Sequence, residues 1–287
     1  MLRYGLSAFL ILCATGALAQ GGPPFRTDDP ETPGNGHWEI NLGCIADHNP
    51  SSSYYETPNF DFNYGLGDRI QLKYEIPVAL HTDSNDTTSA GPGNSLLGIK
   101  WRYYEHRRAA ATPHDDKTVN FALSTYPQIS FDNPTSSVRR GVVQYRGPMF
   151  LLPLEANARI GWLRIDGEVG YWFGNADAPD QWIRGMIAGH EFTERTELYA
   201  EIYDQQDANR IGDQPKQREA TLDLGGRHSL NKAGTLVLLF MGGRSFQTVT
   251  PTNGQPNWIG YLGLQMLLGA KEENKQIEKK LPDEDQR

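Results

Sequence analysis

Residues 60–80 follow a two-residue alternation that limits the folds open to this chain. From residue 70 to residue 80 every even position is apolar, and Lys73 and Glu75 lie between them. A period of two predicts a β-strand with one apolar and one polar face. The Gly-Leu-Gly-Asp sequence at residues 65–68 supplies the turn that joins this strand to a preceding alternating run in a hairpin.

Two classes of all-β protein use such a hairpin, and they differ in what the apolar face contacts. A water-soluble sheet buries its apolar face, whereas a membrane-spanning barrel turns that face to lipid and its polar face to a wet lumen. The ends of the chain and the lengths of the loops distinguish the two classes.

Residues 1–19 have the pattern of a secretory signal peptide. Arg3 forms the short basic region, an apolar run follows, and Ala-Leu-Ala at residues 17–19 is a small-x-small cleavage site. The apolar run of about a dozen residues is shorter than the roughly 20 that a spanning helix needs, so we expect export with cleavage. Cys44 is then the only cysteine left, which excludes an intrachain disulfide and a cysteine metal site.

The composition is acidic, with 35 Asp and Glu against 27 Lys and Arg and a formal net charge of −8. An acidic exported chain repels the phosphate backbone, so we expect no nucleic-acid partner. The mean hydropathy is low, as expected for a barrel in which every second strand residue faces water. No linker-like change of composition divides the chain, which favours a single all-β domain.

Residues 20–36 are rich in Gly and Pro and are therefore unsuited to a central strand. We interpret them as an N-terminal periplasmic arm. Phe25, Arg26, Asp28 and Asp29 are candidates for a plug that occupies the pore. The alternative is a solvated lead-in, which is the commoner state of a terminal segment.

The barrel itself is predicted at residues 37–268, as an antiparallel up-and-down sheet of about twelve membrane-spanning strands. Residues 269–287 are mostly charged and are predicted to be a disordered tail. Apart from the two strands of the opening hairpin, the expected strands cover residues 37–47, 95–105, 118–127, 150–160, 163–173, 182–192, 196–204, 220–227, 235–246 and 258–268.

The connections between these strands alternate long and polar with short, and residues 106–116 are the one intermediate case. Outer-membrane barrels have this asymmetry, because their outer loops are long and their periplasmic turns are short. Aromatic residues near the strand ends suit the girdle of a membrane interface: Trp38, Tyr64, Trp162, Tyr171, Trp182 and Trp258. Together with the signal peptide, these features favour an outer-membrane barrel over a secreted sandwich.

A more specific pattern lies near the start of the chain. An arm with Phe, Thr, Asp and two Pro precedes a Tyr-Gly-Leu-x-Asp-Arg turn and an amphipathic strand that ends in Ile-Pro. The positions are Phe25, Thr27, Asp29, Pro30, Pro33, Tyr64, Gly65, Leu66, Asp68, Arg69, Ile76 and Pro77. This stretch resembles the bacterial outer-membrane β-barrel transporter family described for the meta-pathway of phenol degradation.

The resemblance implies a barrel that transports small molecules, hydrophobic or aromatic ones among them, and it implies no catalytic residue and no cofactor. Membrane lipid and the barrel-assembly machinery are the expected partners. Such barrels often end on an aromatic residue that the machinery reads, whereas residues 265–268 are Gln-Met-Leu-Leu and a charged tail follows. Either the insertion signal of this chain differs from the usual one, or its last strand lies elsewhere.

Few residues of the chain suggest chemistry. His228 and Ser229 are sequence neighbours, so in a strand they point to opposite faces and cannot form a dyad. His81 and Ser84 can approach each other where a loop starts, but no third orienting residue is evident. The His and Asp residues in the 106–116 connection match no metal-ligand spacing. We therefore expect neither an enzyme nor a metal protein.

Charged residues in mid-strand, opposite the apolar stripes, are the stronger candidates for function. Rings of such charges set selectivity in pores. The alternative is that opposite charges pair across a narrow lumen and only brace its wall. The candidates are Lys73, Glu75, Lys100, Arg102, Arg159, Arg164, Asp166, Glu168, Asp223 and Arg227.

The sequence therefore predicts an outer-membrane β-barrel channel or transporter for small molecules. A lipid-modifying barrel enzyme is one alternative, and a structural or adhesive barrel with partner-binding loops is the other. The solute, the direction of transport and the oligomeric state are left open.

Overall fold

A computed structural model describes residues 22–49, 52–106, 119–133, 141–143, 147–213, 215–249 and 257–269, so the predicted signal peptide and most of the charged tail lie outside it. No helix in these ranges is long and apolar enough to cross a membrane. The strands are β1 (Trp38–Asn49), β2 (Ser52–Leu66), β3 (Ile70–Thr82), β4 (Thr88–Pro92), β5 (Ser95–His106), β6 (Val119–Thr125), β7 (Gln128–Phe131), β8 (Met149–Ile160), β9 (Leu163–Phe173), β10 (Gln181–Thr193), β11 (Thr196–Asp207), β12 (Arg218–Ser229), β13 (Leu236–Val249) and β14 (Trp258–Leu268).

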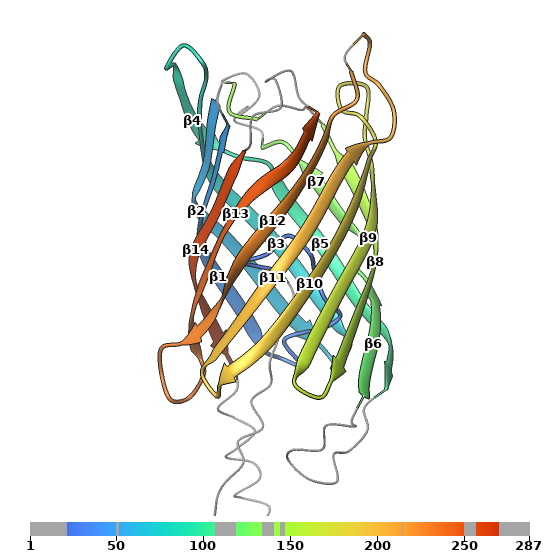
Figure 1. The fold of residues 1–287 in the computed structure, drawn as a ribbon, viewed down its shortest axis with the longest axis vertical. Coiled ribbons are helices and arrows are strands. Elements are labelled where there is room, and N and C mark those ends of the chain that lie inside the picture. The colour runs from blue at the N-terminus through green and yellow to red at the C-terminus, as the bar shows by residue number, and fades with distance from the viewer. Residues whose placement is uncertain are drawn as a thin grey trace, which may run out of the picture.

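The described strands close into one antiparallel barrel. β1 pairs with β14 along its length, from Trp38 opposite Leu268 to His48 opposite Trp258, so the sheet has no free edge at that seam. The result is a tall cylinder of tilted strands (Figure 1). Closure satisfies the backbone N–H and C=O groups that an open edge would leave unpaired.

Twelve strand positions, which we call staves, make up the wall in the described residues. Each stave is one strand, except for one that consists of two strands in line. β6 and β7 both pair with β5 and with β8, so together they form one stave. The break falls at Pro127, which has no N–H to give to the ladder. β4 pairs only with β3 and extends it as a hairpin beyond the wall. The predicted barrel of about twelve strands is confirmed.

The β3–β4 hairpin differs from the prediction, which placed a polar loop here. Asp83 Oδ1 accepts hydrogen bonds from the backbone N–H groups of Asn85 (2.8 Å) and Thr87 (3.0 Å), and Asp86 takes a positive φ of 58°. This Asx turn reverses the chain and returns residues 88–92 to β3. β2 also starts earlier than expected, because its polar first residues pair with the end of β1.

The apolar faces of the staves point outward. Leu72, Met186 and Leu224 are examples of the large apolar side chains that remain exposed on the outside of the barrel. The intervening residues, such as Lys73 and Glu75 on β3, point into the lumen. The opening hairpin is therefore inverted relative to a water-soluble sheet, as a surrounding bilayer requires.

The two ends of the barrel differ in their connections. Residues 67–69, 161–162, 194–195 and 230–235 form short turns at the lower end in Figure 1, and residues 174–180 form a longer loop at the upper end. Gly67 and Gly161 take positive φ angles of 66° and 58° in these turns, a conformation that a Cβ atom disfavours. Two connections differ from this contrast: β1 and β2, joined at the upper end, are separated by two residues in sequence, and β5 and β6, joined at the lower end, are separated by twelve. We refer to the two ends as the turn end and the loop end.

Candidate functional site

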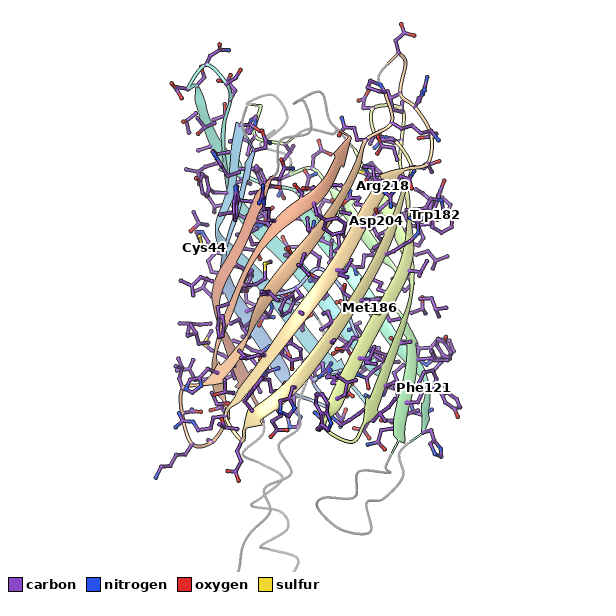
Figure 2. The ribbon with its side chains drawn as sticks, viewed as in Figure 1. Cys44, Phe121, Trp182, Met186, Asp204 and Arg218 are labelled. Atoms are coloured by element: carbon purple, nitrogen blue, oxygen red, sulfur yellow. The ribbon has the colours of Figure 1, made fainter. Side chains whose placement is uncertain are left out.

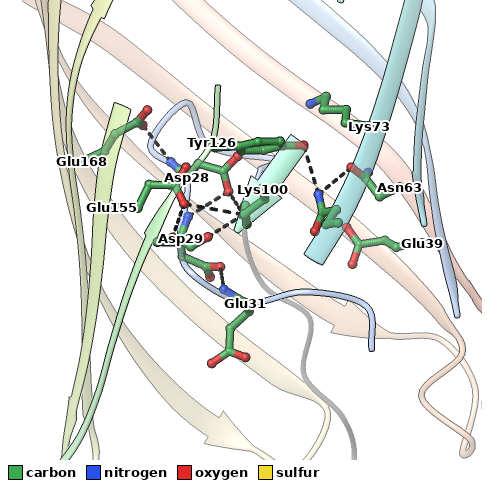
Figure 3. A network of polar contacts seen from close by, with 12 residues as sticks. Asp28, Asp29, Glu31, Glu39, Asn63, Lys73, Lys100, Tyr126, Glu155 and Glu168 are labelled. Atoms are coloured by element: carbon green, nitrogen blue, oxygen red, sulfur yellow. Dashed lines mark hydrogen bonds and ion pairs between the residues drawn. The ribbon is translucent and has the colours of Figure 1, made fainter. Parts of the chain in front are cut away.

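The N-terminal arm lies inside the barrel. It leaves β1 at the turn end, where Gly36 N donates a hydrogen bond to Gly65 O (2.9 Å), and from there it extends into the lumen. Thr27 and Asp29 are each 1% exposed, which is the burial of a protein core. Figure 3 shows this segment among the lumen side chains. The alternative of a solvated lead-in is therefore wrong.

The sequence of the arm favours its bent shape. Asp28 Oδ1 accepts a hydrogen bond from Asp29 N, and Asp29 Oδ1 accepts one from Glu31 N, both at 2.8 Å. Short Asp side chains that bond the nearby backbone stabilise turns. Asp28 Oδ1 also faces Lys100 on the wall, and the other oxygen of Asp29, Oδ2, faces Arg164.

Lys100 of β5 holds the arm on one side of the lumen. Its Nζ atom donates to Asp28 Oδ1 at 2.6 Å and to the main-chain oxygen of Asp29, and it lies 4.0 Å from Glu155 Oε2. The same ammonium is 4.7 Å from the centre of the Tyr126 ring (Figure 3). The Lys100 side chain is fully buried, so the arm supplies the charge that such a buried cation needs.

β9 contacts Asp28 and Asp29 of the arm through one acidic and one basic side chain. Glu168 Oε2 accepts a hydrogen bond from Asp28 N at 3.0 Å, and the guanidinium of Arg164 donates to Asp29 Oδ2. Burial raises the pKa of Asp29 to about 6, and the Arg164 guanidinium opposes that rise. Asp166 Oδ2 fixes the guanidinium from the wall at 2.8 Å.

β11 and β12 hold the arm from the other side. Glu201 Oε1 accepts hydrogen bonds from Arg26 N (3.1 Å) and Thr27 N (2.6 Å). The Arg26 side chain lies 3.3 Å from Asp223 Oδ2 and stacks over the Tyr203 ring at 4.2 Å. Carboxylates that accept from backbone N–H groups form some of the stronger hydrogen bonds in proteins.

The arm therefore bridges the diameter of the barrel. β5 and β12 are six staves apart in the closed ring of twelve described staves, which places them on opposite sides. Asp28 bonds Lys100 on β5, and Arg26, only two residues earlier, bonds Asp223 on β12. A segment anchored to opposite walls by neighbouring residues must cross the pore at that level.

Close backbone approach also fixes the arm. A Cβ atom added to Gly185 of β10 would overlap the side chain of Thr27, and one added to Gly65 would overlap the main-chain oxygen of Gly34. Only glycine, which has no side chain, leaves enough space at these two wall positions for the arm to pass.

Phe25 is the apolar anchor of the arm. It packs in a buried cluster with Ile187, Val237, Leu239, Met241 and Tyr261 from β10, β13 and β14. Its ring also meets Tyr199 of β11 edge to face, with the centroids 5.8 Å apart. The arm thus contacts staves around most of the barrel wall.

Two predicted lumen cations lie at the margins of the arm. Arg102 Nη1 binds Glu31 Oε2 at 3.1 Å, where the arm passes the turn end. Lys73 binds Glu75 (3.0 Å) and Asp61 (3.4 Å) and so links side chains of the wall to each other. Lys73 thus pairs within the wall, whereas Arg102 pairs with the arm.

All ten predicted lumen residues point inward. Arg227 bonds Gln265 Oε1 at 2.8 Å, and Arg159 lies opposite Arg164 in the register near the turn end. The residues that contact the arm are Lys100, Arg102, Arg164, Glu168 and Asp223. Their role in selectivity remains a prediction, as does the role of Phe25, Arg26, Asp28 and Asp29 as a plug.

Other lumen residues were not among the candidates. Glu201 and Tyr126 contact the arm or its lysine, and Glu39 and Asp61 line the wall. Each lies on the inward face of its stave, so assigning a face to every expected strand would have found most of them. Tyr126 lies at the break between β6 and β7, where the alternation gives no guide.

Acidic side chains predominate in the lumen. Nine Asp and Glu residues of the wall but only four of its Lys and Arg residues are buried among the described positions, and Asp28 and Asp29 of the arm add two more acids. Glu56 and Glu75, toward the loop end, share the amide of Asn59 at 2.7 and 2.8 Å. The lining of the pore therefore attracts cations more than anions.

The described histidines do not form the His81–Ser84 pair that the sequence analysis considered and set aside. His81 Nδ1 bonds Gly141 O at 3.0 Å rather than Ser84. A Ser–His contact that the sequence did not suggest joins Ser53 Oγ to His48 Nδ1 at 2.7 Å, on the exposed end of the β1–β2 hairpin. The described residues contain no cluster of three metal-ligating side chains. Most of the 106–116 connection lies outside the described ranges.

No family model and no curated protein matches the chain. Solved structures resemble its fold: an outer membrane channel from Pseudomonas putida F1 has a TM-score of 0.61 at 13% identity, over 83% of this chain and 98% of that one. The translocator domain of the autotransporter NalP from Neisseria meningitidis gives 0.48 at 10% identity, over 80% and 88%. The KdgM porin gives 0.45 at 8% identity, over 79% and 98%. The match to the Pseudomonas putida F1 channel shows that the chain shares the fold of an outer-membrane barrel.

Proposed function

We propose that this chain is an outer-membrane channel for small molecules whose lumen is closed by its own N-terminal arm. The observation that carries the proposal is the bridge across the pore, from Lys100 through the arm to Asp223. A channel with a plug of this kind conducts only when the plug shifts or leaves.

A location in the outer membrane is supported by the outward apolar faces and by the contrast between short turns and long loops. The predicted signal peptide is consistent with export. In that orientation the loop end faces the exterior and the arm arises on the periplasmic side.

The contacts of the arm suit a plug that can be released. Apart from Phe25, the arm is held mainly by charge-assisted hydrogen bonds rather than by a broad apolar interface. Water can replace such bonds when the arm moves out, and Arg164 then keeps Asp166 as a partner in the wall. The wall can therefore stay folded while the plug leaves.

The acidic lining supports a preference for small cationic or neutral polar solutes over anions. The hydrophobic or aromatic compounds implied by the resemblance to the phenol-degradation family stay a separate prediction. The apolar contacts available to such compounds at the level of the arm are those of the wall cluster that packs around Phe25.

Planar-bilayer recording tests the proposal with two proteins, the full barrel and a variant that lacks residues 22–33. We expect a low or flickering conductance for the full barrel, and a larger, steady, cation-selective conductance for the truncated one. A variant with residues 22–33 in scrambled order controls for the loss of chain length. If neither barrel conducts after confirmed insertion, the channel function is wrong; equal conductance would refute closure by the arm.

A further inference from the structure

Two arginines and one aspartate form a triad on the outer wall, away from the lumen. Asp204 of β11 lies between Arg184 of β10 and Arg218 of β12. Its Oδ2 is 2.7 Å from Arg184 Nη1, and its Oδ1 is 2.7 Å from Arg218 Nε. All three side chains lie on the outward face of their strands, since the alternate residues Ile183, Tyr203 and Thr221 are buried inside.

The triad lies at the border between the apolar belt and the loop end. Met186 and Ile202 are the next outward residues toward the middle of the barrel on β10 and β11, and on β12 the buried Ala220 comes before Leu222. Met186, Ile202 and Leu222 are each about half exposed. Figure 2 shows Arg218, Asp204 and Trp182 close to the loop end and Met186 below them. The triad thus lies where the hydrocarbon core gives way to lipid headgroups.

Aromatic side chains mark the same level. Trp182 stands beside Arg184, whose guanidinium lies 6.0 Å from the ring centre, and Tyr171 contacts Trp182 edge to face at 4.8 Å. Tryptophan and tyrosine rings prefer the interface, with their apolar part toward the lipid chains. The depth of the triad is therefore supported by its neighbours as well as by the apolar belt.

The triad carries an excess of positive charge. Among the described residues, both guanidiniums have Asp204 as their only ion-pair partner, so two cations share one carboxylate. Each guanidinium has five N–H donors in a planar fork that fits phosphate oxygens. The Arg184 and Arg218 side chains are 46% and 37% exposed, so free donors face the lipid.

We propose that Arg184 and Arg218 bind the phosphate of an anionic lipid headgroup in the leaflet at the loop end. Asp204 pairs with both guanidiniums and neutralises part of their charge. The binding site is independent of the lumen and of the arm, but it rests on the proposed location of the barrel in a membrane.

The test measures lipid binding to the detergent-solubilised full barrel by native mass spectrometry, with phosphorylated lipid A as the probe. We expect R184Q and R218Q each to weaken the affinity about fivefold, since one basic side chain near an anionic surface contributes about that factor. K232Q is the matched control: it removes an exposed cation from a turn at the opposite end and should leave the affinity unchanged.

The D204N variant separates lipid binding from simple bracing. With the carboxylate gone, the two arginines no longer share a neutralising partner, so lipid A should bind more tightly than to the wild type. If Asp204 only braced the wall, the D204N variant would bind lipid A with the affinity of the wild type. That result would overturn the proposal.

Two further probes identify the source of the phosphate. Dephosphorylated lipid A should bind the wild type no better than it binds the R184Q/R218Q double variant. Inorganic phosphate that competes fully at a concentration equal to that of lipid A would overturn the lipid headgroup as the ligand. Recovery of the protein as a soluble periplasmic monomer would instead refute the membrane location, whereas a barrel that inserts but shows no phosphate preference would refute only this inference.

Discussion

At the scale of the residue, Lys100 decides whether the arm stays in the lumen. It is fully buried and faces carboxylates from both the arm and the wall, Asp28 and Glu155. Without its charge these acids repel each other in a site shielded from water. Removing one partner of a buried ion pair costs about 3–5 kcal/mol, because the remaining charge is left uncompensated.

The K100Q variant should therefore release the arm. Arg26 then becomes accessible to trypsin, and we expect cleavage after this residue to be much faster than in the wild type, as followed by mass spectrometry. K73Q is the matched control, because Lys73 pairs with Asp61 and Glu75 of the wall and makes no described contact with the arm. Equal cleavage rates for K100Q and K73Q would contradict the role assigned to Lys100.

At the scale of the element, each stave has a lipid face and a lumen face, and depth decides what the lipid face tolerates. β11 has outward residues at two depths. Ile202 points outward near the middle of the strand, and Gln206 points outward near its loop end. A lysine in the centre of the bilayer must lose water, whereas one near the headgroups keeps it.

We expect I202K to lower the free energy of unfolding by about 2–4 kcal/mol and Q206K by less than about 1 kcal/mol. Urea unfolding of the barrel in phospholipid vesicles measures both. Similar losses for the two variants would show that this face of β11 does not follow the depth of a bilayer.

Alternation predicted the elements well, for a physical reason that also sets its limit. Where one face meets lipid and the other meets water, every second residue is constrained, so β8 and β9 were predicted to within one residue of their observed bounds. The β3–β4 hairpin extends beyond that boundary, and polar residues there carry no alternation. Its turn depends on the Asp83 side chain, a local signal that periodicity does not detect.

At the scale of the whole molecule, the barrel and its arm form one polar system. The sequence indicated which charges face the lumen but left open whether the arm enters it, because that depends on pairs far apart in the chain. Asp29 and Arg164 are an example, as are Thr27 and Glu201. Such pairing follows from the closed ring, which brings β5 and β12 to opposite sides of one narrow space.

The most direct measurement of closure by the arm is the single-channel current of the barrel without residues 22–33, recorded while a synthetic peptide of residues 22–36 is added. Since the arm reaches the lumen from the turn end, we predict a reversible, concentration-dependent block from that side only. A peptide with Asn at positions 28 and 29 should block more weakly, because Lys100 and Arg164 lose their charged partners. A current that the arm peptide leaves unchanged at saturating concentration from either side would contradict the account.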